Sequence, residues 1–133
     1  MEQETKLDFI VIDDDPMNNI ICRKMIELTV PGATVNTFTL PREGLAYILA
    51  TFSINSDDNA ILFLDINMPV LNGWEVLEKF SEFPEMVKKK VKIYMLSSSV
   101  DLQDKENAEN NPFVSGYITK SISQAKLRAL FPN

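Results

Sequence analysis

The sequence predicts an α/β domain with a doubly wound, five-stranded parallel sheet. Short apolar segments alternate with longer segments whose apolar residues recur at helical spacing. The apolar segments are continuous runs and not alternating patterns, which is typical of strands that helices cover on both faces. Polar and acidic residues follow several of these runs, where such folds place their functional sites. At 133 residues we expect one domain, covering residues 1–133.

Five strands are expected, each bounded by turn-forming or polar residues. The first and third, Leu7–Ile12 and Ala60–Ile66, are the clearest because they are almost uninterrupted apolar runs. The remaining three expected strands are Thr34–Phe38, Val91–Leu96 and Phe113–Thr119.

Five helices are expected between and after these strands. The first begins at Pro16, because Asp15 suits the N-cap and proline suits the first helical position. Its inward face is predicted to carry Met17, Ile20, Ile21, Met25 and Leu28. The second helix begins at Pro41, and the others are expected within Gly73–Phe83, Val100–Asn111 and Ser121–Phe131.

Four smaller features have ordinary structural interpretations. We expect Thr51–Asn59 to be a surface insertion and Lys88–Lys90 to be a solvated basic connector. Cys22 and Trp74 are expected to serve in packing. Few apolar residues lie in Val100–Asn111, so this segment should pack weakly and be the part that moves when the domain switches.

Composition excludes several classes of function. The chain has no histidine and one cysteine, which removes histidine-based catalysis, Cys-based zinc sites and an internal disulfide, and favours a reducing cytoplasm. A net charge of -6 argues against nucleic-acid binding. The N-terminus does not resemble a signal peptide, and the apolar runs are too short to span a membrane, so no membrane association is expected.

Carboxylates, a hydroxyl and an amine follow the predicted strands. Asp13 and Asp14 follow the first strand and Asp65 the third, while Ser97 and Lys120 follow the fourth and fifth. Three carboxylates in one pocket repel each other and need a cation, for which Mg²⁺ is suited because it prefers oxygen ligands. A carboxylate beside Mg²⁺ and lysine is equipped to attack phosphorus and form an aspartyl phosphate.

Each of these residues, considered on its own, also has an ordinary structural interpretation. Asp15 fits a helix cap, Asp65 a turn, Ser97 a loop hydroxyl, and Lys120 a solvated lysine. It is their joint placement at successive strand ends that predicts a site.

Four motifs in order carry a family resemblance. They are Val11–Asp15, Leu64–Pro69 with Gly73 after it, Met95–Ser98 and Gly116–Lys120. On these motifs the chain resembles a response-regulator receiver domain of two-component signalling over nearly its whole length. The resemblance implies a flavodoxin-like sheet with strand order 2-1-3-4-5.

The resemblance also implies roles for individual residues. Asp65 would accept a phosphoryl group from the phosphohistidine of a histidine kinase or histidine phosphotransfer protein. Lys120 would pair with Asp65 and then with the phosphoryl group, and Ser97 would move to hydrogen-bond it. Tyr117 would turn inward with Ser97, and the small Ser98 would leave room for the phosphoryl group.

The implied Mg²⁺ site draws on neighbouring positions. Asp14 and Asp65 would bind the ion directly, Asp13 mainly through water, and Asn67 through its backbone carbonyl. Where the family usually has a proline, often in a cis bond, this chain has Ser121. We therefore expect a trans bond after Lys120, because a non-proline cis bond costs roughly 3 kcal/mol.

The resulting prediction is a stand-alone phosphoacceptor switch or relay, not an enzyme, that acts on a downstream target protein in the cytoplasm. We expect no DNA-binding or enzymatic output segment after Phe131. One alternative is a Mg²⁺-dependent hydrolase with an aspartate nucleophile, although Asn67 stands where such enzymes need an acid. The others are an interaction module that is never phosphorylated, and a flavin binder, which would need a phosphate loop where three acids stand.

Overall fold

The fold is built around a parallel sheet of five strands. A computed structural model describes residues 7–54, 57–98 and 101–131 of the chain. The strands are β1 (Leu7–Ile12), β2 (Thr34–Phe38), β3 (Asn59–Asp65), β4 (Val91–Ser97) and β5 (Val114–Thr119). Their order in the sheet is β2-β1-β3-β4-β5, with every pair parallel. The predicted fold class and strand order are confirmed.

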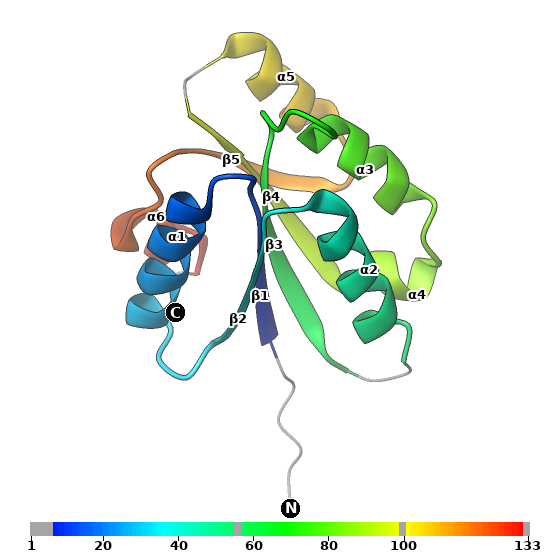
Figure 1. Cartoon of the computed structure of the whole chain (residues 1–133), viewed down its shortest axis with the longest axis horizontal. Coiled ribbons are helices and arrows are strands. Elements are labelled where there is room, and N and C mark those ends of the chain that lie inside the picture. The colour runs from blue at the N-terminus through cyan, green and yellow to red at the C-terminus, as the bar shows by residue number, and fades with distance from the viewer. Residues whose placement is uncertain (1–6, 55–56, 99–100, 132–133) are drawn as a thin grey trace, which may run out of the picture.

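Helices cover both faces of the sheet. They are α1 (Pro16–Thr29), α2 (Pro41–Phe52), α3 (Gly73–Ser81), α4 (Glu85–Lys88), α5 (Leu102–Asn110) and α6 (Gln124–Leu130). Helices α1 and α6 lie on one side of the sheet and α2, α3 and α4 on the other, with α5 at the upper end beside α3 (Figure 1). The buried Ala108 of α5 belongs to the same core as residues of α2 and α3. This arrangement explains why the strands are apolar on both sides.

Each face of the sheet has its own core. In β3, Leu62 and Leu64 belong to the core beneath α2, α3 and α4, whereas Ile61 and Phe63 belong to the core beneath α1 and α6. This alternation follows from the two-residue period of a strand. All four side chains are at most 5% exposed, so β3 is the buried centre of the domain.

The strand order determines where a site can form. The chain leaves β1 for β2 on one side and then crosses to β3 on the other side of β1. At such a switch point the loops diverge and leave a crevice at the carboxyl ends of the strands. Ile12 of β1 is paired with Leu64 of β3. The residues that follow them, Asp13 and Asp65, therefore lie next to each other at the carboxyl edge of the sheet.

The predicted inward face of α1 is wrong in part: Met25 packs against the core and Ile21 is half-buried, but the other three residues are exposed. Met17 and Ile20 are each 61% exposed, and Leu28 is 50% exposed. The buried residues of this helix are Asn18, Asn19, Cys22 and Ile26. The two asparagines face inward because they bind Asp13, as described below, and this requirement rotates the helix away from the face that apolar spacing indicated.

The expectation of a solvated connector at Lys88–Lys90 is also wrong. Residues Glu85–Lys88 form the short helix α4, and Lys90 is only 8% exposed. The Lys90 ammonium donates to the backbone carbonyls of Phe52 and Ile54, at 3.3 and 2.6 Å, and so holds the end of α2. A buried lysine can be stable because these carbonyls replace its hydration.

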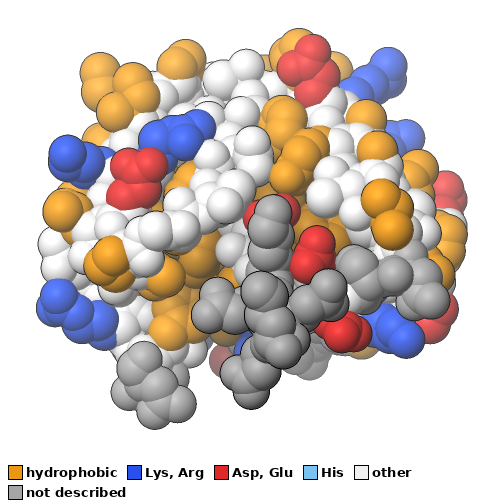
Figure 2. All heavy atoms as spheres, turned by 90° about the horizontal axis from the view of Figure 1, so that it is seen from below, with side chains coloured by type: hydrophobic (Ala, Val, Ile, Leu, Met, Phe, Trp, Pro, Cys, Tyr) orange, Lys and Arg blue, Asp and Glu red, His pale blue; other side chains and the backbone are white. Residues whose placement is uncertain are grey.

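The amino ends of the strands form the end of the molecule opposite the switch point. Lys88, Lys89 and Lys92 line a hollow of about 520 Å³ there, together with Phe113. Figure 2 views the molecule from this end and shows apolar, acidic and basic side chains mixed on its surface. Among the described residues, no helix is long and apolar enough to cross a membrane.

Candidate functional site

The carboxyl ends of four neighbouring strands bring the polar residues together. Asp13 and Asp14 directly follow β1, and Asp65 is the last residue of β3. Oxygen atoms of these three carboxylates lie within 4.8 Å of one another. Ser97 ends β4 and Lys120 follows β5, so both lie along the same edge of the sheet.

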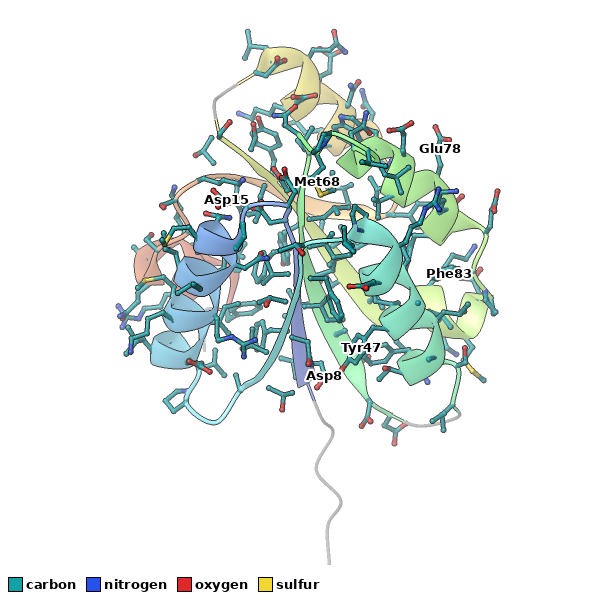
Figure 3. All side chains as sticks on the ribbon, in the orientation of Figure 1. Asp8, Asp15, Tyr47, Met68, Glu78 and Phe83 are labelled. Atoms are coloured by element: carbon teal, nitrogen blue, oxygen red, sulfur yellow. The ribbon has the colours of Figure 1, made fainter. Side chains whose placement is uncertain are left out.

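Two labelled pairs of side chains mark the two ends of the sheet in Figure 3. Asp15 and Met68 lie at the upper end, where the carboxylates gather, and Asp8 and Tyr47 lie toward the lower end. The Tyr47 hydroxyl donates to Asp8 at 3.3 Å. This second acidic contact therefore lies far from the cluster and takes no part in it.

Asp13 is fully buried and its carboxylate is held from several sides. Its Oδ1 accepts from the backbone N–H of Asp15 at 2.9 Å. Its Oδ2 accepts from Asn18 Nδ2 at 2.5 Å and from Lys120 Nζ at 2.8 Å. Asn19 Nδ2 donates to the Asp13 backbone carbonyl at 3.0 Å. The side chain and the backbone of Asp13 are thus both fixed.

Asp65 is 3% exposed and has weaker partners. Its Oδ1 lies 3.2 Å from Lys120 Nζ and 3.4 Å from the backbone N–H of Asn67. Burial, together with the nearby charge of Asp13, raises the pKa of Asp65 to about 6, although Lys120 and the Asn67 N–H act in the opposite direction. Near neutral pH the carboxylate is therefore mostly ionised, and ionisation is less favourable than in water.

Lys120 bridges the two buried carboxylates. Burial alone would lower its pKa, but the hydrogen bond and charge of Asp13, together with Asp65, outweigh burial and raise the pKa. Its backbone N–H donates to the Ser97 carbonyl at 2.7 Å, which ties the end of β5 to the end of β4. Lys120 therefore remains a fixed positive charge between Asp13 and Asp65.

The bond that follows Lys120 is not as expected. The Lys120–Ser121 peptide bond is cis, so the expectation of a trans bond is wrong. That expectation used only the residue type after the bond. In the folded chain both sides of the bond are held, because Lys120 N–H binds the Ser97 carbonyl and Lys126 Nζ binds the Ser121 carbonyl at 3.0 Å.

Close packing between α3 and the end of β3 depends on Gly73. The Gly73 N–H donates to the Ile66 carbonyl at 2.9 Å. A Cβ atom on Gly73 would lie 2.7 Å from the Asp65 carbonyl oxygen and 2.9 Å from Met95 Cε. Glycine is needed here because the backbone of α3 approaches the backbone of Asp65 directly.

The remaining predicted residues divide into buried and accessible ones. Ser97 is 1% exposed, whereas Asp14, Asn67 and Ser98 are exposed to solvent at the rim of the cluster. Asp14 also lines an apolar hollow of about 420 Å³ beside the cluster. The cluster therefore has a buried floor and an open side from which a reactant could enter.

Two contacts connect α5 to the rest of the domain near this edge. Trp74 Nε1 donates to Asp104 at 3.3 Å, and the N–H of Asp101 donates to the Tyr117 hydroxyl at 3.5 Å. Among the described residues of α5 only Ala108 is buried, and Leu102 is 77% exposed. This sparse packing agrees with the low apolar content of Val100–Asn111, of which residue 100 lies outside the described part of the chain.

Asn18 and Asn19 are site residues that sequence reasoning missed. They lie in the first turn of α1, three and four residues after the N-cap Asp15. The available signal was a pair of amides directly after a run of three acids and a proline. Apolar spacing at Met17 and Ile20 obscured this signal, because it indicated a different inward face.

The donor set of the cluster fits a hard divalent cation. Its three candidate side-chain ligands are carboxylates, and one of them, Asp14, is open to solvent. Mg²⁺ favours such oxygen ligands and keeps several waters, which an open side allows. Lys120 offsets one of the three negative charges when no cation is bound.

Comparison with known proteins identifies the family. The sequence model described as "Response regulator receiver domain" matches residues 9–131. The chain belongs to this family. Receiver domains take phosphoryl groups from histidine kinases, and they generally bind Mg²⁺ at an acidic pocket. The comparison with curated proteins found no match.

Solved receiver structures resemble this receiver domain over almost their whole length. A response regulator receiver protein from Dyadobacter fermentans is 27% identical, with a TM-score of 0.80, and the match covers 96% of this chain and 99% of that one. A two-component response regulator from Cytophaga hutchinsonii is 26% identical with a TM-score of 0.85, covering 97% and 96%. A CheY-like receiver from Methanospirillum hungatei, at 23% identity and a TM-score of 0.72, covers 97% and 92% and supports the fold alone.

Family membership narrows the alternative functions that the sequence left open. Receiver domains are generally signalling modules that accept a phosphoryl group and are not classical enzymes, so membership of this family does not favour the hydrolase. It does not favour the flavin binder either. Whether this receiver domain is phosphorylated or acts as an unphosphorylated interaction module depends on the chemistry of its own residues.

Proposed function

We propose that this receiver domain is a phosphoacceptor switch or relay and that Asp65 takes the phosphoryl group. The observation that supports this proposal best is the setting of Asp65. Its carboxylate is buried beside Asp13 and 3.2 Å from the Lys120 ammonium, with the open side of the cluster at Asp14. A carboxylate held in this way is oriented and incompletely neutralised, as a nucleophile needs to be.

The proposed reaction is a phosphoryl transfer between two side chains. An oxygen of Asp65 bonds to the phosphorus of a phosphohistidine, and the bond from phosphorus to the imidazole nitrogen breaks. The bonding electrons remain on the imidazole, so the products are an aspartyl phosphate and a histidine. The donor histidine belongs to a histidine kinase or histidine phosphotransfer protein, since this chain has none.

Charge is balanced by a cation and by Lys120. Mg²⁺, when held by Asp14, Asp65 and the Asn67 backbone carbonyl, with Asp13 acting through water, would neutralise charge on the phosphoryl oxygens. Lys120 would remain paired with Asp13 and contact the new phosphoryl group. The two ammonium contacts to Asp13 and Asp65 support this role.

The output of the switch is proposed to be altered binding to a downstream target protein. Ser97 would donate its hydroxyl to the phosphoryl group, and the small Ser98 would leave space for that group. Tyr117 would follow Ser97 inward. The contact between the Tyr117 hydroxyl and the N-cap of α5 supports this coupling, because a movement of Tyr117 would release or reposition that helix.

Phosphorylation by a small phosphodonor tests the proposal. We expect wild-type protein with Mg²⁺ to gain the mass of one phosphoryl group, and we expect no gain in the presence of a chelator or in Asp65→Asn. Asp57→Asn serves as the matched control, because Asp57 is an exposed aspartate outside the cluster. Intact mass spectrometry measures the gain, and peptide mapping locates it.

Three outcomes would contradict the proposal. Labelling without metal would remove the role of Mg²⁺, and labelling of Asp65→Asn would assign the phosphoryl group to another residue. A wild-type protein that no donor can label would instead favour the unphosphorylated interaction module.

A further inference from the structure

Two buried asparagines at the start of α1 bind the same aspartate. Asn18 is 8% exposed and Asn19 is 4% exposed. Burying an amide costs free energy unless it is hydrogen-bonded, so amides on the inward face of a helix need a specific partner. Here the partner is Asp13, through its carboxylate for Asn18 and through its backbone carbonyl for Asn19.

The contact of Asn18 is the shorter of the two and reaches the acidic cluster. Its Nδ2 lies 2.5 Å from Asp13 Oδ2, the same oxygen that binds Lys120 at 2.8 Å. The other carboxylate oxygen, Oδ1, accepts from the N–H of Asp15. The plane of the Asp13 carboxylate is therefore set by three donors from three directions.

Asn18 is itself held rigidly in place. It lies in the first turn of α1, whose N-cap Asp15 accepts from the N–H of Met17 at 3.0 Å. Its amide also lies 3.7 Å from the buried sulfur of Cys22, one turn later on the same inward face. A donor fixed in this way constrains the orientation of the carboxylate that it binds.

We propose that Asn18 is a positioning residue for the divalent-cation site, which it orders by orienting the Asp13 carboxylate. This inference rests on the proposed function, because it assigns a second layer to the same site. Without Asn18, only Lys120 would hold Asp13 Oδ2, and the carboxylate could turn toward the lysine and away from Asp14 and Asp65. Partners that orient a metal-binding carboxylate from outside typically contribute 10- to 100-fold to metal affinity.

Titration with Mg²⁺ alone tests this role. Asn18→Leu keeps a similar volume and removes the donor, and we expect its dissociation constant for Mg²⁺ to rise about tenfold. Asn18→Asp places a further carboxylate against Asp13 and should alter the constant more than Asn18→Leu does. Asn36→Leu is the matched control, because Asn36 is a partly buried asparagine that donates to Tyr47 instead of the cluster, and its constant should stay within about twofold of wild type.

A second readout separates positioning from general loss of structure. With a small phosphodonor and increasing Mg²⁺, Asn18→Leu should need more Mg²⁺ for half-maximal phosphorylation but approach the wild-type rate at saturation. Circular dichroism establishes that each variant is folded. If Asn18→Leu does not fold, Asn18→Ala, which leaves room for water, replaces it in both measurements.

The results distinguish this inference from the proposed function. A folded Asn18→Leu or Asn18→Ala variant with the wild-type Mg²⁺ constant would overturn the inference, even if Asp65 is phosphorylated normally. The inference would also be overturned if the variant had a lower phosphorylation rate at saturating Mg²⁺ but an unchanged dissociation constant for Mg²⁺. Conversely, a tenfold weaker Mg²⁺ constant in a protein that no donor labels would support the positioning role and contradict the phosphoacceptor function.

Discussion

Lys120 lies closer to Asp13 than to Asp65, with its ammonium nitrogen 2.8 Å from Asp13 Oδ2 and 3.2 Å from Asp65 Oδ1. The lysine is therefore shared between a fully buried carboxylate and the proposed nucleophile. Its shorter contact is with Asp13, which is not the proposed nucleophile. This division leaves Asp65 the less neutralised of the two and predicts how substitutions in the cluster will behave.

Replacing Lys120 with methionine should destabilise the metal-free protein. Asp13 and Asp65 would lose their shared cation while both remain buried, and breaking such a pair costs about 3 kcal/mol. Urea unfolding in the presence of a chelator measures the loss, and Lys92→Met, at an exposed position, is the control. Added Mg²⁺ should restore part of the stability. An unchanged unfolding midpoint would show that the contacts of Lys120 contribute nothing.

Asp65→Asn should have the opposite effect, and the effect should depend on pH. The pKa of Asp65 is about 6 in the folded protein and 3.8 ordinarily, so the folded state holds its proton more tightly. The contribution of Asp65 to stability is thus fully present below about pH 4 and is lost as the pH rises through 6. At neutral pH in chelator, Asp65→Asn should gain about 1–3 kcal/mol in free energy of unfolding.

The difference between Asp65→Asn and wild type should nearly vanish at about pH 3, below the ordinary pKa of 3.8, where Asp65 is largely protonated in both the folded and the unfolded state. Urea unfolding at a series of pH values tests this, with Asp57→Asn as the control. A variant that is less stable than wild type at neutral pH would show that the contact with Lys120 outweighs burial.

Gly73→Ala should both destabilise the domain and slow phosphorylation. The added Cβ would lie 2.7 Å from the Asp65 carbonyl oxygen, and overpacking of this kind costs about 1–3 kcal/mol. Gly32→Ala provides the comparison, since Gly32 has a φ of 83° and open space around it. It should lower stability by about 1–2 kcal/mol through backbone strain but leave the phosphorylation rate unchanged. Equal rates in the two variants would contradict the link between Gly73 and the site.

Helix α5 should be the element whose amide exchange changes most on phosphorylation. Its packing is sparse, and two of its contacts lead to Trp74 and Tyr117 near the site. Hydrogen exchange of Leu102–Asn110 should differ between phosphorylated and unmodified protein, while exchange in α2, which buries Ile48 and Phe52 completely, should not. Identical exchange of α5 in both forms would refute this prediction.

Cys22 should react slowly with thiol reagents in the folded protein. Burial, with a smaller contribution from the charge of Asp13, raises its pKa to about 12, so almost no reactive thiolate forms. Alkylation followed by mass spectrometry should be slow under native conditions and fast in urea. Rapid native alkylation would mean that α1 opens readily and that Asn18 is held less firmly than its contacts indicate.

Strand positions were predictable because burial on both faces leaves a simple pattern. Leu7–Ile12 and Thr34–Phe38 have the predicted bounds. β4 and β5 differ from their predicted bounds by one residue at one end, and β3 differs by one residue at each end. Convergence of Asp13, Asp65 and Lys120 followed from strand order, since parallel strands end at one edge. The positions of the strands can therefore be predicted from long apolar runs alone, without any information on side-chain contacts.

The misplaced features all depend on contacts that sequence spacing does not encode. The face of α1 is set by hydrogen bonds from Asn18 and Asn19 to Asp13. Lys90 is buried because carbonyls of a distant segment accept from it. The bond after Lys120 is cis although its residue types favour trans. In each case a long-range polar contact accompanies the departure from a local preference.

Neighbouring residues of the cluster differ sharply in access to water. Asp13 is sealed beneath α1, and Asp14, the next residue along the chain, faces solvent. Asp13 is thus part of the rigid framework, while a cation could reach Asp14 directly from solvent. Loading and release of a cation would then require no opening of the domain, so exchange with the surrounding medium should be limited by loss of bound water and not by protein motion.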